Sequence, residues 1–331
     1  VAGTPYANLA EMAERIVAAA QATGTGLTLL PVLYMEGGCD GRPLVGGQRR
    51  CGNDHDRYAD LHANSSRALE HGHWDHRMGY AAHSLRAVPP DALTRLVEIA
   101  AEGPVHMHLA EQVAEVEEVE GHLGTRPVEW VTDNLPLDPR WCLIHCTQMT
   151  DDETHRLAAT GAVAGLCPIT ESSLGDGIFN GVAFQAAQGR YGVGSDSNIH
   201  IALWEELATL EYSQRLRDRC RASLATGERS SGRMVFDAAV QGGAQAAGRA
   251  SGSIAVGQTA DFVGIATDNE FLCNRTGDAL LDSLIFTGRG RACVTDVWSA
   301  GRHMVQGGRH IHRDRIVAAF LAVTEDLGQS I

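Results

Sequence analysis

Histidine and carboxylate side chains that could bind a metal occur together in the stretch VHMHLAEQ, residues 105–112. His106 and His108 are two positions apart, and Glu111 follows three positions after the second histidine. Zinc accepts histidine nitrogen and carboxylate oxygen, and a catalytic zinc site keeps one position open for water. Such a water has a pKa near ~7, so the stretch indicates metal-assisted hydrolysis. The alternative for each histidine is a hydrogen-bonded core residue.

Further candidates lie in three other segments: HSLR contains His83 and Arg86, LIHCT contains His145, and VGSDSN contains Asp196. Asp196 could both bind zinc and accept a proton from the metal-bound water. His145 could bind metal or donate a hydrogen bond to a reacting group, and Arg86 could hold a carboxylate through a bidentate fork. The alternatives are a helix N-cap for Asp196, a surface ion pair for Arg86, and a helix N-terminal carboxylate for Glu111.

The elements that must position these residues are short apolar segments, each followed by a helix pattern. They cover residues 26–34, 78–84, 104–110, 141–147, 162–168 and 190–196. Segments that are apolar on both faces are typical of parallel strands covered by helices. The candidate residues lie at the C-terminal ends of these segments, where a (β/α)₈ barrel has its active site. A doubly wound sheet also binds ligands there, but no glycine-rich phosphate fingerprint follows these strands.

Strand geometry separates the roles of the two histidines in VHMHLAEQ. Residues two apart in a strand face the same way, so both should point into the barrel. His108 is nearer the C-terminal end, and His106 lies one layer deeper. We therefore expect one ligand, His108, and one supporting residue, His106.

The order of segments predicts an α/β fold with a second, smaller unit. Residues 1–250 are expected to form a (β/α)₈ TIM-type barrel that lacks its first two strands, since the segments number six, not eight. Glycine-separated segments at 251–312 predict short antiparallel strands, the C-terminal part of a small β-sandwich, and 313–331 a final helix. Helix patterns also cover residues 7–22, 200–219 and 234–249, the second of them amphipathic.

Composition excludes several classes of function. The 331 residues carry a net charge of −14, which disfavours nucleic-acid binding because phosphates need a basic face. The eight cysteines form no C-x-x-C pair, which indicates buried or free thiols and no disulfide framework. No apolar run approaches the ~20 residues that cross a membrane. We expect a cytoplasmic homodimer that binds a small-molecule substrate. We expect it to bind neither nucleic acid nor a membrane.

In combination, these motifs resemble the amidohydrolase superfamily and, within it, the formimidoylglutamate deiminase family. The resemblance runs along nearly the whole chain and is carried by GLTLLPVLY, GQRR, AAHSLRAV, VHMHLAEQ, RWCLIHCT, GAVAGLCP, TESSLGDGIF, YGVGSDSNI, LEYSQRLRDR and GSIAVGQTADF. It implies that His108 and Asp196 are zinc ligands, with Asp196 also a base. It implies that Glu111 and His145 are the other catalytic residues.

The resemblance also implies a substrate and a reaction. His83 and Arg86 would bind the glutamate carboxylates of N-formimino-L-glutamate. Hydrolysis at the formimino carbon would release ammonia and N-formyl-L-glutamate, a step of histidine degradation. General acid–base assistance to such a step is typically worth ~10² to 10⁴-fold in rate.

One feature departs from the family pattern: the first H-x-H pair, two further zinc ligands at the end of strand one, is absent. We expect those ligands upstream of Val1, in a sequence truncated at its N-terminus, and weak zinc binding with little turnover by this chain alone. One alternative is an aminohydrolase of guanine or cytosine type, although a flat ring favours stacking and only 5% of residues are aromatic. The other is a non-catalytic incomplete barrel.

Overall fold

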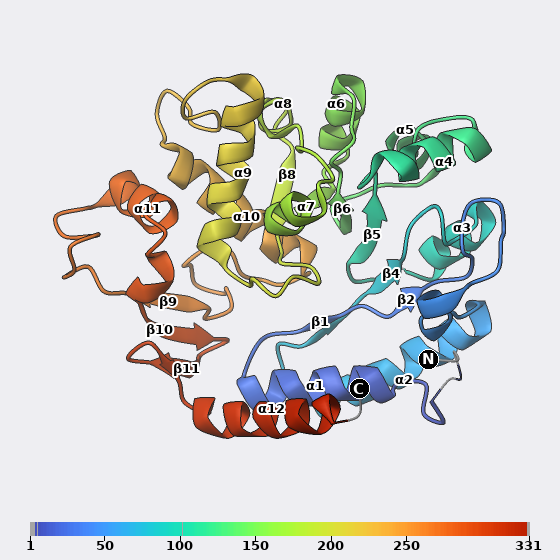
Figure 1. Ribbon diagram of the computed structural model, residues 1–331, viewed down its shortest axis with the longest axis horizontal. Coiled ribbons are helices and arrows are strands. Elements are labelled where there is room, and N and C mark those ends of the chain that lie inside the picture. Colours follow the sequence, from blue (N-terminus) through green and yellow to red (C-terminus); the bar gives the residue numbers. More distant parts are fainter. Residues whose placement is uncertain (1–3, 5, 101, 330–331) are drawn as a thin grey trace.

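A parallel sheet forms the centre of the protein, whose computed structural model describes residue 4, residues 6–100 and residues 102–329. This sheet has six strands, which lie side by side in the order in which they occur along the chain (Figure 1). They are β2 (Val32–Leu33), β4 (Tyr80–Ala82), β5 (Val105–Leu109), β6 (Trp141–His145), β7 (Val163–Leu166) and β8 (Arg190–Val193). All neighbours pair in parallel. Strands β2 and β8 are its two edges.

The six predicted strand segments are confirmed, although the first two are each interrupted. Residues 26–34 form β1 (Thr28–Leu29) and β2, and residues 78–84 contribute to β3 (Arg77–Met78) and β4. Pro31 separates β1 from β2. Proline has no N–H to donate to a strand ladder, so one ladder cannot continue through it. Strands β1 and β3 instead form a separate parallel pair.

Helices follow the strands and cover the outside of the sheet (Figure 1). Their bounds are α1 Glu11–Thr23, α2 His55–Leu69, α3 Pro90–Ile99, α4 Val113–Leu123, α5 Pro127–Asn134, α6 Asp151–Thr160, α7 Pro168–Leu174, α8 Gly181–Ala186, α9 Leu203–Asp218, α10 Ser231–Ala246, α11 Gly277–Phe286 and α12 Arg313–Gly328. Helix α6 begins with a capping box, in which the Thr150 hydroxyl accepts from the Glu153 N–H and the Glu153 carboxylate accepts from the Thr150 N–H. None of the described helices is long and apolar enough to cross a membrane.

The hydrophobic core lies between the sheet and these helices. Its largest fully buried side chains include Trp141 and Leu143 of β6, Tyr191 of β8 and Phe184 of α8. Strand β5 shows how the sequence produces this layer. Val105, Met107 and Leu109 are buried, and the two histidines alternate with them on the opposite face.

Helix α9 departs from the predicted amphipathic pattern. It spans the expected region, but its buried face carries Glu206, Glu211 and Gln214 beside leucines. The carboxylate of Glu211 accepts hydrogen bonds from the backbone N–H groups of Ser223 and Leu224, at 2.8 and 3.0 Å. The Arg215 guanidinium also donates to this carboxylate at 2.6 Å, so the buried charge of Glu211 is tolerated because backbone donors and an arginine satisfy it.

A second, antiparallel sheet has the order β12 (Arg309–His310), β11 (Arg302–Gln306), β10 (Val294–Ser299) and β9 (Phe262–Ile265). Figure 1 shows its strands below α11, with α12 leading away from them. The predicted antiparallel strands and final helix are therefore confirmed, and so is the fold class. The unit boundaries at residues 250 and 312 stay a prediction.

One buried carboxylate ties the second sheet to the parallel strands. Asp75, just before β3, is 2% exposed. Its two oxygens accept from the Arg302 guanidinium of β11 at 2.8 and 3.0 Å, and one also accepts from Arg249 Nη2 at 3.0 Å. Although burial alone raises the pKa of Asp75, the two guanidinium groups dominate and hold it well below its usual range.

Candidate active site

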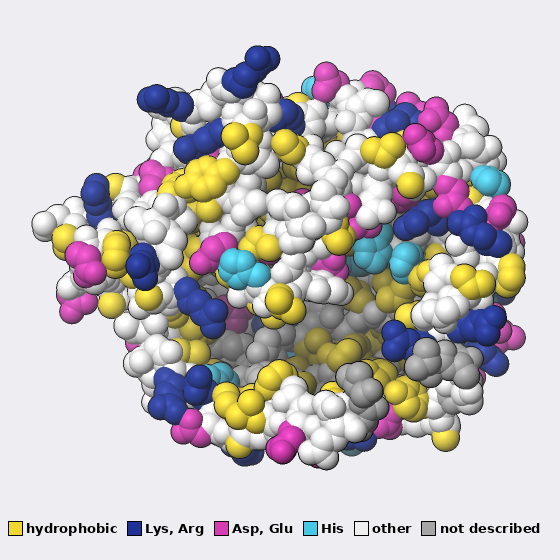
Figure 2. Space-filling model, viewed as in Figure 1, with side chains coloured by type: hydrophobic (Ala, Val, Ile, Leu, Met, Phe, Trp, Pro, Cys, Tyr) yellow, Lys and Arg dark blue, Asp and Glu magenta, His cyan; other side chains and the backbone are white. Residues whose placement is uncertain are grey.

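Three histidines meet where the central strands end. His83 follows β4, His108 lies in β5 and His145 ends β6. The ring centroids of His83 and His108 are 5.0 Å apart, and those of His108 and His145 are 5.7 Å apart. Figure 2 shows histidine side chains at the edge of a hollow in this face of the molecule. The structure therefore brings these three predicted residues together.

His108 is oriented as a metal ligand should be. Its Nδ1 lies 2.8 Å from the carbonyl oxygen of His83. A carbonyl only accepts hydrogen bonds, so Nδ1 carries a proton, and in the neutral ring the lone pair is on Nε2. A hydrogen bond from one ring nitrogen to a backbone carbonyl is the usual way in which a metal-binding histidine is held.

His106 has the supporting position that strand geometry predicts. Its Nε2 lies 2.8 Å from the carbonyl oxygen of Ala246, the last residue of α10. Because the last carbonyls of a helix have no partner within it, this contact satisfies one of them. Burial lowers the pKa of His106.

Glu111 and His145 face each other across the site. His145 Nε2 lies 3.6 Å from Glu111 Oε1. Burial raises the pKa of Glu111. Burial by itself lowers the pKa of His145, but the hydrogen bond to Glu171 and the charges of Glu111, Glu171 and Asp196 raise it above its usual value. Two titratable groups with displaced pKa values in contact are typical of an acid–base pair.

Asp196 lies in the exposed loop after β8, close enough for its charge to act on His145. The helix N-cap alternative for Asp196 is wrong, because α9 begins only at Leu203 and Ala202 is its N-cap. The helix N-terminus alternative for Glu111 stays a prediction. Glu111 precedes the α4 N-cap, Gln112, and Glu115 is the acidic residue of the first turn.

Left-handed backbone conformations concentrate at these strand ends. The φ angles are 51° for Ala110, 73° for His145, 53° for Cys146 and 51° for Asp196. Non-glycine residues rarely adopt positive φ, and each costs of order ~1 kcal/mol or more. The buried carboxylate of Glu115 accepts from the N–H groups of Ala110 and Glu111 at 3.1 and 2.9 Å, which stabilises one of these turns.

His83 and Arg86 lie beside the histidine group. Burial, with the charges of His108 and Arg86, lowers the pKa of His83 to about 4, so its ring is neutral at pH 7. The ring contacts Tyr34 edge to face, with centroids 4.3 Å apart. Arg86 Nε is buried and has no hydrogen-bond partner among the described residues. An unsatisfied guanidinium donor of this kind suits an incoming carboxylate.

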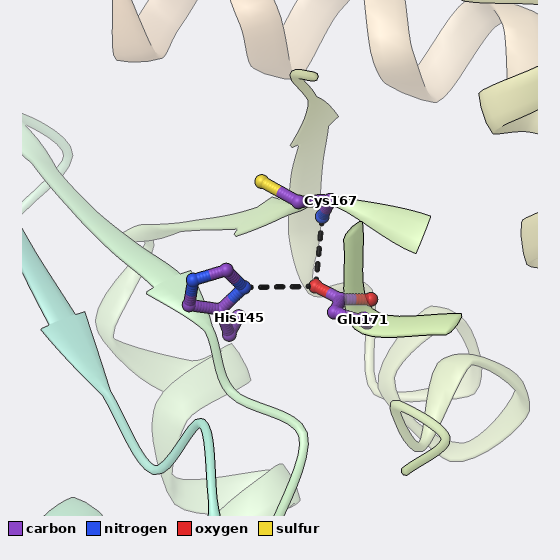
Figure 3. Close-up of side chains that lie close together, drawn as sticks. All are labelled: His145, Cys167 and Glu171. Carbon is purple, nitrogen blue, oxygen red and sulfur yellow. Dashed lines mark hydrogen bonds and ion pairs between the residues drawn. The ribbon is translucent and has the colours of Figure 1, made fainter. Parts of the chain in front are cut away.

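Two buried residues of the site received no role from the sequence, although Glu171 lies in the TESSLGDGIF segment. Glu171 Oε1 lies 3.2 Å from His145 Nδ1 and accepts from the Cys167 N–H at 2.7 Å (Figure 3). Ligand atoms of His145, Cys167 and Glu171 all lie within 4.8 Å of one another. The available signal was an acidic residue in the first turn of a helix that begins at Pro168.

The donors that fit a metal best are the lone pair on His108 Nε2 and the exposed carboxylate of Asp196. Neutral imidazole and carboxylate are ligands that zinc accepts. Cys167 fits less well, because burial holds the pKa of its thiol well above the usual range and zinc binds the thiolate.

Comparison with known proteins agrees with this geometry. The amidohydrolase family matches residues 7–304. The chain is 44% identical to a formimidoylglutamate deiminase of Pseudomonas aeruginosa, over 98% of this chain and 72% of that protein. It is 28% identical to a 5-methylthioadenosine/S-adenosylhomocysteine deaminase of Bacillus cereus, over 72% of this chain and 54% of that protein, about half its length.

Solved structures show the same fold. An amidohydrolase from Brucella melitensis superimposes with a TM-score of 0.93 at 49% identity, covering 98% of this chain and 72% of that one. An adenosine deaminase from Xanthomonas campestris with bound zinc superimposes with a TM-score of 0.81 at 23% identity, over 96% of this chain and 70% of that one, which shows the fold alone. Sequence, fold and the grouping of residues at the strand ends lead to one conclusion: the chain belongs to the amidohydrolase family, as a hydrolase that acts on carbon–nitrogen bonds.

Proposed function

We propose that this chain contributes its site to the zinc-dependent hydrolysis of N-formimino-L-glutamate to N-formyl-L-glutamate and ammonia. The observation that carries the proposal is the contact between Glu111 and His145 beside His108, with the unsatisfied Arg86 Nε nearby. The similarity to the deiminase of Pseudomonas aeruginosa supports the choice of substrate.

His108 and Asp196 would hold the zinc ion. When bound, zinc would lower the pKa of a water molecule and supply hydroxide at neutral pH. Asp196 would accept a proton from that water. Glu111 would take up a proton and transfer it to the leaving nitrogen, a role that burial favours because it raises the pKa of this carboxyl.

The remaining residues would orient the substrate. His145 would form a hydrogen bond to a group bonded to the reacting carbon. Its side chain is 1% exposed, so little water competes for that hydrogen bond. Arg86 would form a bidentate pair with one glutamate carboxylate, and the neutral His83 ring would lie beside it. A net charge of −14 agrees with a small-molecule partner and disfavours nucleic acid.

A second candidate is deamination of an adenosine-type ring, which the names of the 28–30% identical relatives suggest. Arg86 discriminates between the two. An adenosine-type ring carries no carboxylate, so it would leave this buried guanidinium donor without the partner that a glutamate carboxylate supplies.

The test is ammonia release from two substrates by the zinc-supplemented protein, with N-formimino-L-glutamate and 5-methylthioadenosine at equal concentration. We expect ammonia from the first substrate alone, released slowly because the sequence already predicts little turnover by this chain by itself, and removal of zinc with a chelator should abolish it. Ammonia from 5-methylthioadenosine alone would favour the second candidate. Zinc bound at one equivalent with no ammonia from either substrate would contradict both.

A further inference from the structure

Glu171 is a buried acid that the proposed reaction does not use. It lies in the first turn of α7 and is 5% exposed. Its Oε1 atom makes two contacts, with the N–H of Cys167 at 2.7 Å and with His145 Nδ1 at 3.2 Å (Figure 3). The carboxylate thus joins the end of β6 to the start of α7.

These contacts determine where the proton of His145 lies. Because Oε1 accepts from the backbone N–H of Cys167, it acts as an acceptor toward His145 as well. Nδ1 therefore carries a proton, and whenever the ring is neutral its lone pair is on Nε2, which faces Glu111 Oε1 at 3.6 Å. We propose that Glu171 is a positioning residue that holds His145 in the Nδ1–H tautomer, with Nε2 presented to the reaction space.

The surroundings of His145 explain why Glu171 can determine its tautomer. His145 has a left-handed φ of 73°, and its side chain is 1% exposed. The contact with Glu171 is the one short hydrogen bond of the ring among the described residues. Without it, nothing would distinguish the two ring nitrogens except the longer contact to Glu111.

Hydrogen bonds to neighbouring elements hold α7 in place. Thr170 donates its hydroxyl proton to the carbonyl of Ser195 at 2.9 Å, immediately before Asp196. The Glu206 carboxylate of α9 accepts from the Ile169 N–H at 2.9 Å at the start of α7. One short helix therefore holds the ends of two strands, through Thr170 and Glu171.

A metal bound by His145, Cys167 and Glu171 would be a different explanation of the same cluster. It would require the His145–Glu171 hydrogen bond to break and the Cys167 thiol to lose its proton. Burial opposes the second step because it raises the pKa of that thiol. Hydrogen bonding accounts for the geometry without either change.

The tautomer can be measured directly by ¹⁵N–¹H NMR of protein labelled at the histidine side chains, with His145→Asn used to assign the signals. We expect Nδ1–H in the unsubstituted protein and in Glu171→Gln, whose amide oxygen still accepts. We expect it also in the control Ser172→Ala, because among the described residues the Ser172 hydroxyl bonds only to the Pro168 carbonyl. Glu171→Ala should give a mixture of tautomers. Nε2–H in the unsubstituted protein would overturn the proposal even if the alanine variant failed to fold. Loss of the Nδ1 proton on addition of one equivalent of zinc would also overturn it, in favour of the metal.

A second test, which rests on the proposed function, measures the kinetics of the same variants. With N-formimino-L-glutamate, Glu171→Ala should lower kcat by about 10- to 100-fold with KM changed by less than about twofold, as for other residues that orient a catalytic side chain. Glu171→Gln should recover most of the rate, and Ser172→Ala should match the unsubstituted protein. An equal rate for Glu171→Ala would refute positioning. Absence of turnover in every variant would contradict the proposed function and leave the NMR result to decide the tautomer.

Discussion

Replacing Asp75 with asparagine should destabilise the protein strongly, because Asp75 is the buried carboxylate between two arginines. The substitution keeps the volume but leaves the charges of Arg249 and Arg302 without their counter-ion. Removing one partner of a buried pair typically costs about 3–5 kcal/mol. The arginine side chains are 13% and 20% exposed, so water recovers part of that loss. We expect a decrease of about 3 kcal/mol in the free energy of unfolding at pH 7.

Urea unfolding, followed by circular dichroism, would measure this change. With a slope of about 3 kcal/mol per molar urea, the midpoint should fall by about 1 M. The matched control is Asp314→Asn, which removes an ion pair between exposed Asp314 and Arg309 and should shift the midpoint very little. A midpoint for Asp75→Asn equal to that of the control would refute the reasoning.

The Asp75 carboxylate should also make the free energy of unfolding depend on pH. Its pKa in the folded protein lies below its unfolded value, so its contribution is fully present above about pH 4 and is lost as pH falls below that. The stability difference between the unsubstituted protein and Asp75→Asn should therefore be constant from pH 6 to pH 8 and shrink below pH 4. A difference that grew in acid would show that the pairing is not ionic.

Three further substitutions test the site and the core. Glu111→Gln should lower kcat for N-formimino-L-glutamate by about 10²- to 10⁴-fold in an ammonia-release assay, because the amide cannot transfer a proton; a smaller loss than tenfold would exclude the acid–base role. Arg86→Lys should raise KM roughly tenfold, because an ammonium cannot form the bidentate pair, and an unchanged KM would place the carboxylate elsewhere. Leu143→Ala in β6 should lower the free energy of unfolding by about 2–5 kcal/mol, whereas Leu174→Ala, at a residue that is 60% exposed, should change it little; equal losses in urea unfolding would contradict the assigned core.

Much of the fold was predictable because strands and helices leave separate signals in the sequence. Runs such as WCLIHCT are apolar on both faces, and that pattern located β6 correctly. Pro31, which separates β1 from β2, is visible in the sequence and has no N–H to donate. The strand interruption was nevertheless not predicted, because Pro31 lies within a continuous apolar run. The buried acids of α9 were not predictable, since a glutamate in a helix normally faces solvent and only the folded chain supplies the backbone donors that Glu206 and Glu211 accept from.

The site also contains residues that the sequence could predict and one that it could not. Residues at strand ends, such as His108 and His145, could be found because a barrel gathers the ends of its strands. Glu171 could not, because an acid in the first turn of a helix has an ordinary explanation in the helix dipole. Its contact with His145 joins residues that are 26 positions apart and depends on how α7 packs.

The left-handed backbone at Ala110, His145, Cys146 and Asp196 has a consequence for engineering. Glycine adopts such conformations without strain, so Ala110→Gly should be tolerated or even favourable, although most alanine-to-glycine changes destabilise. The other three positions offer no such freedom, because two carry proposed catalytic side chains and the buried Cys146 thiol donates to the Leu143 carbonyl at 3.4 Å, a contact that glycine would lose. Thermostabilisation of this scaffold should therefore begin at Ala110 and in the surface helices, and leave the rest of the strand-end backbone as it is.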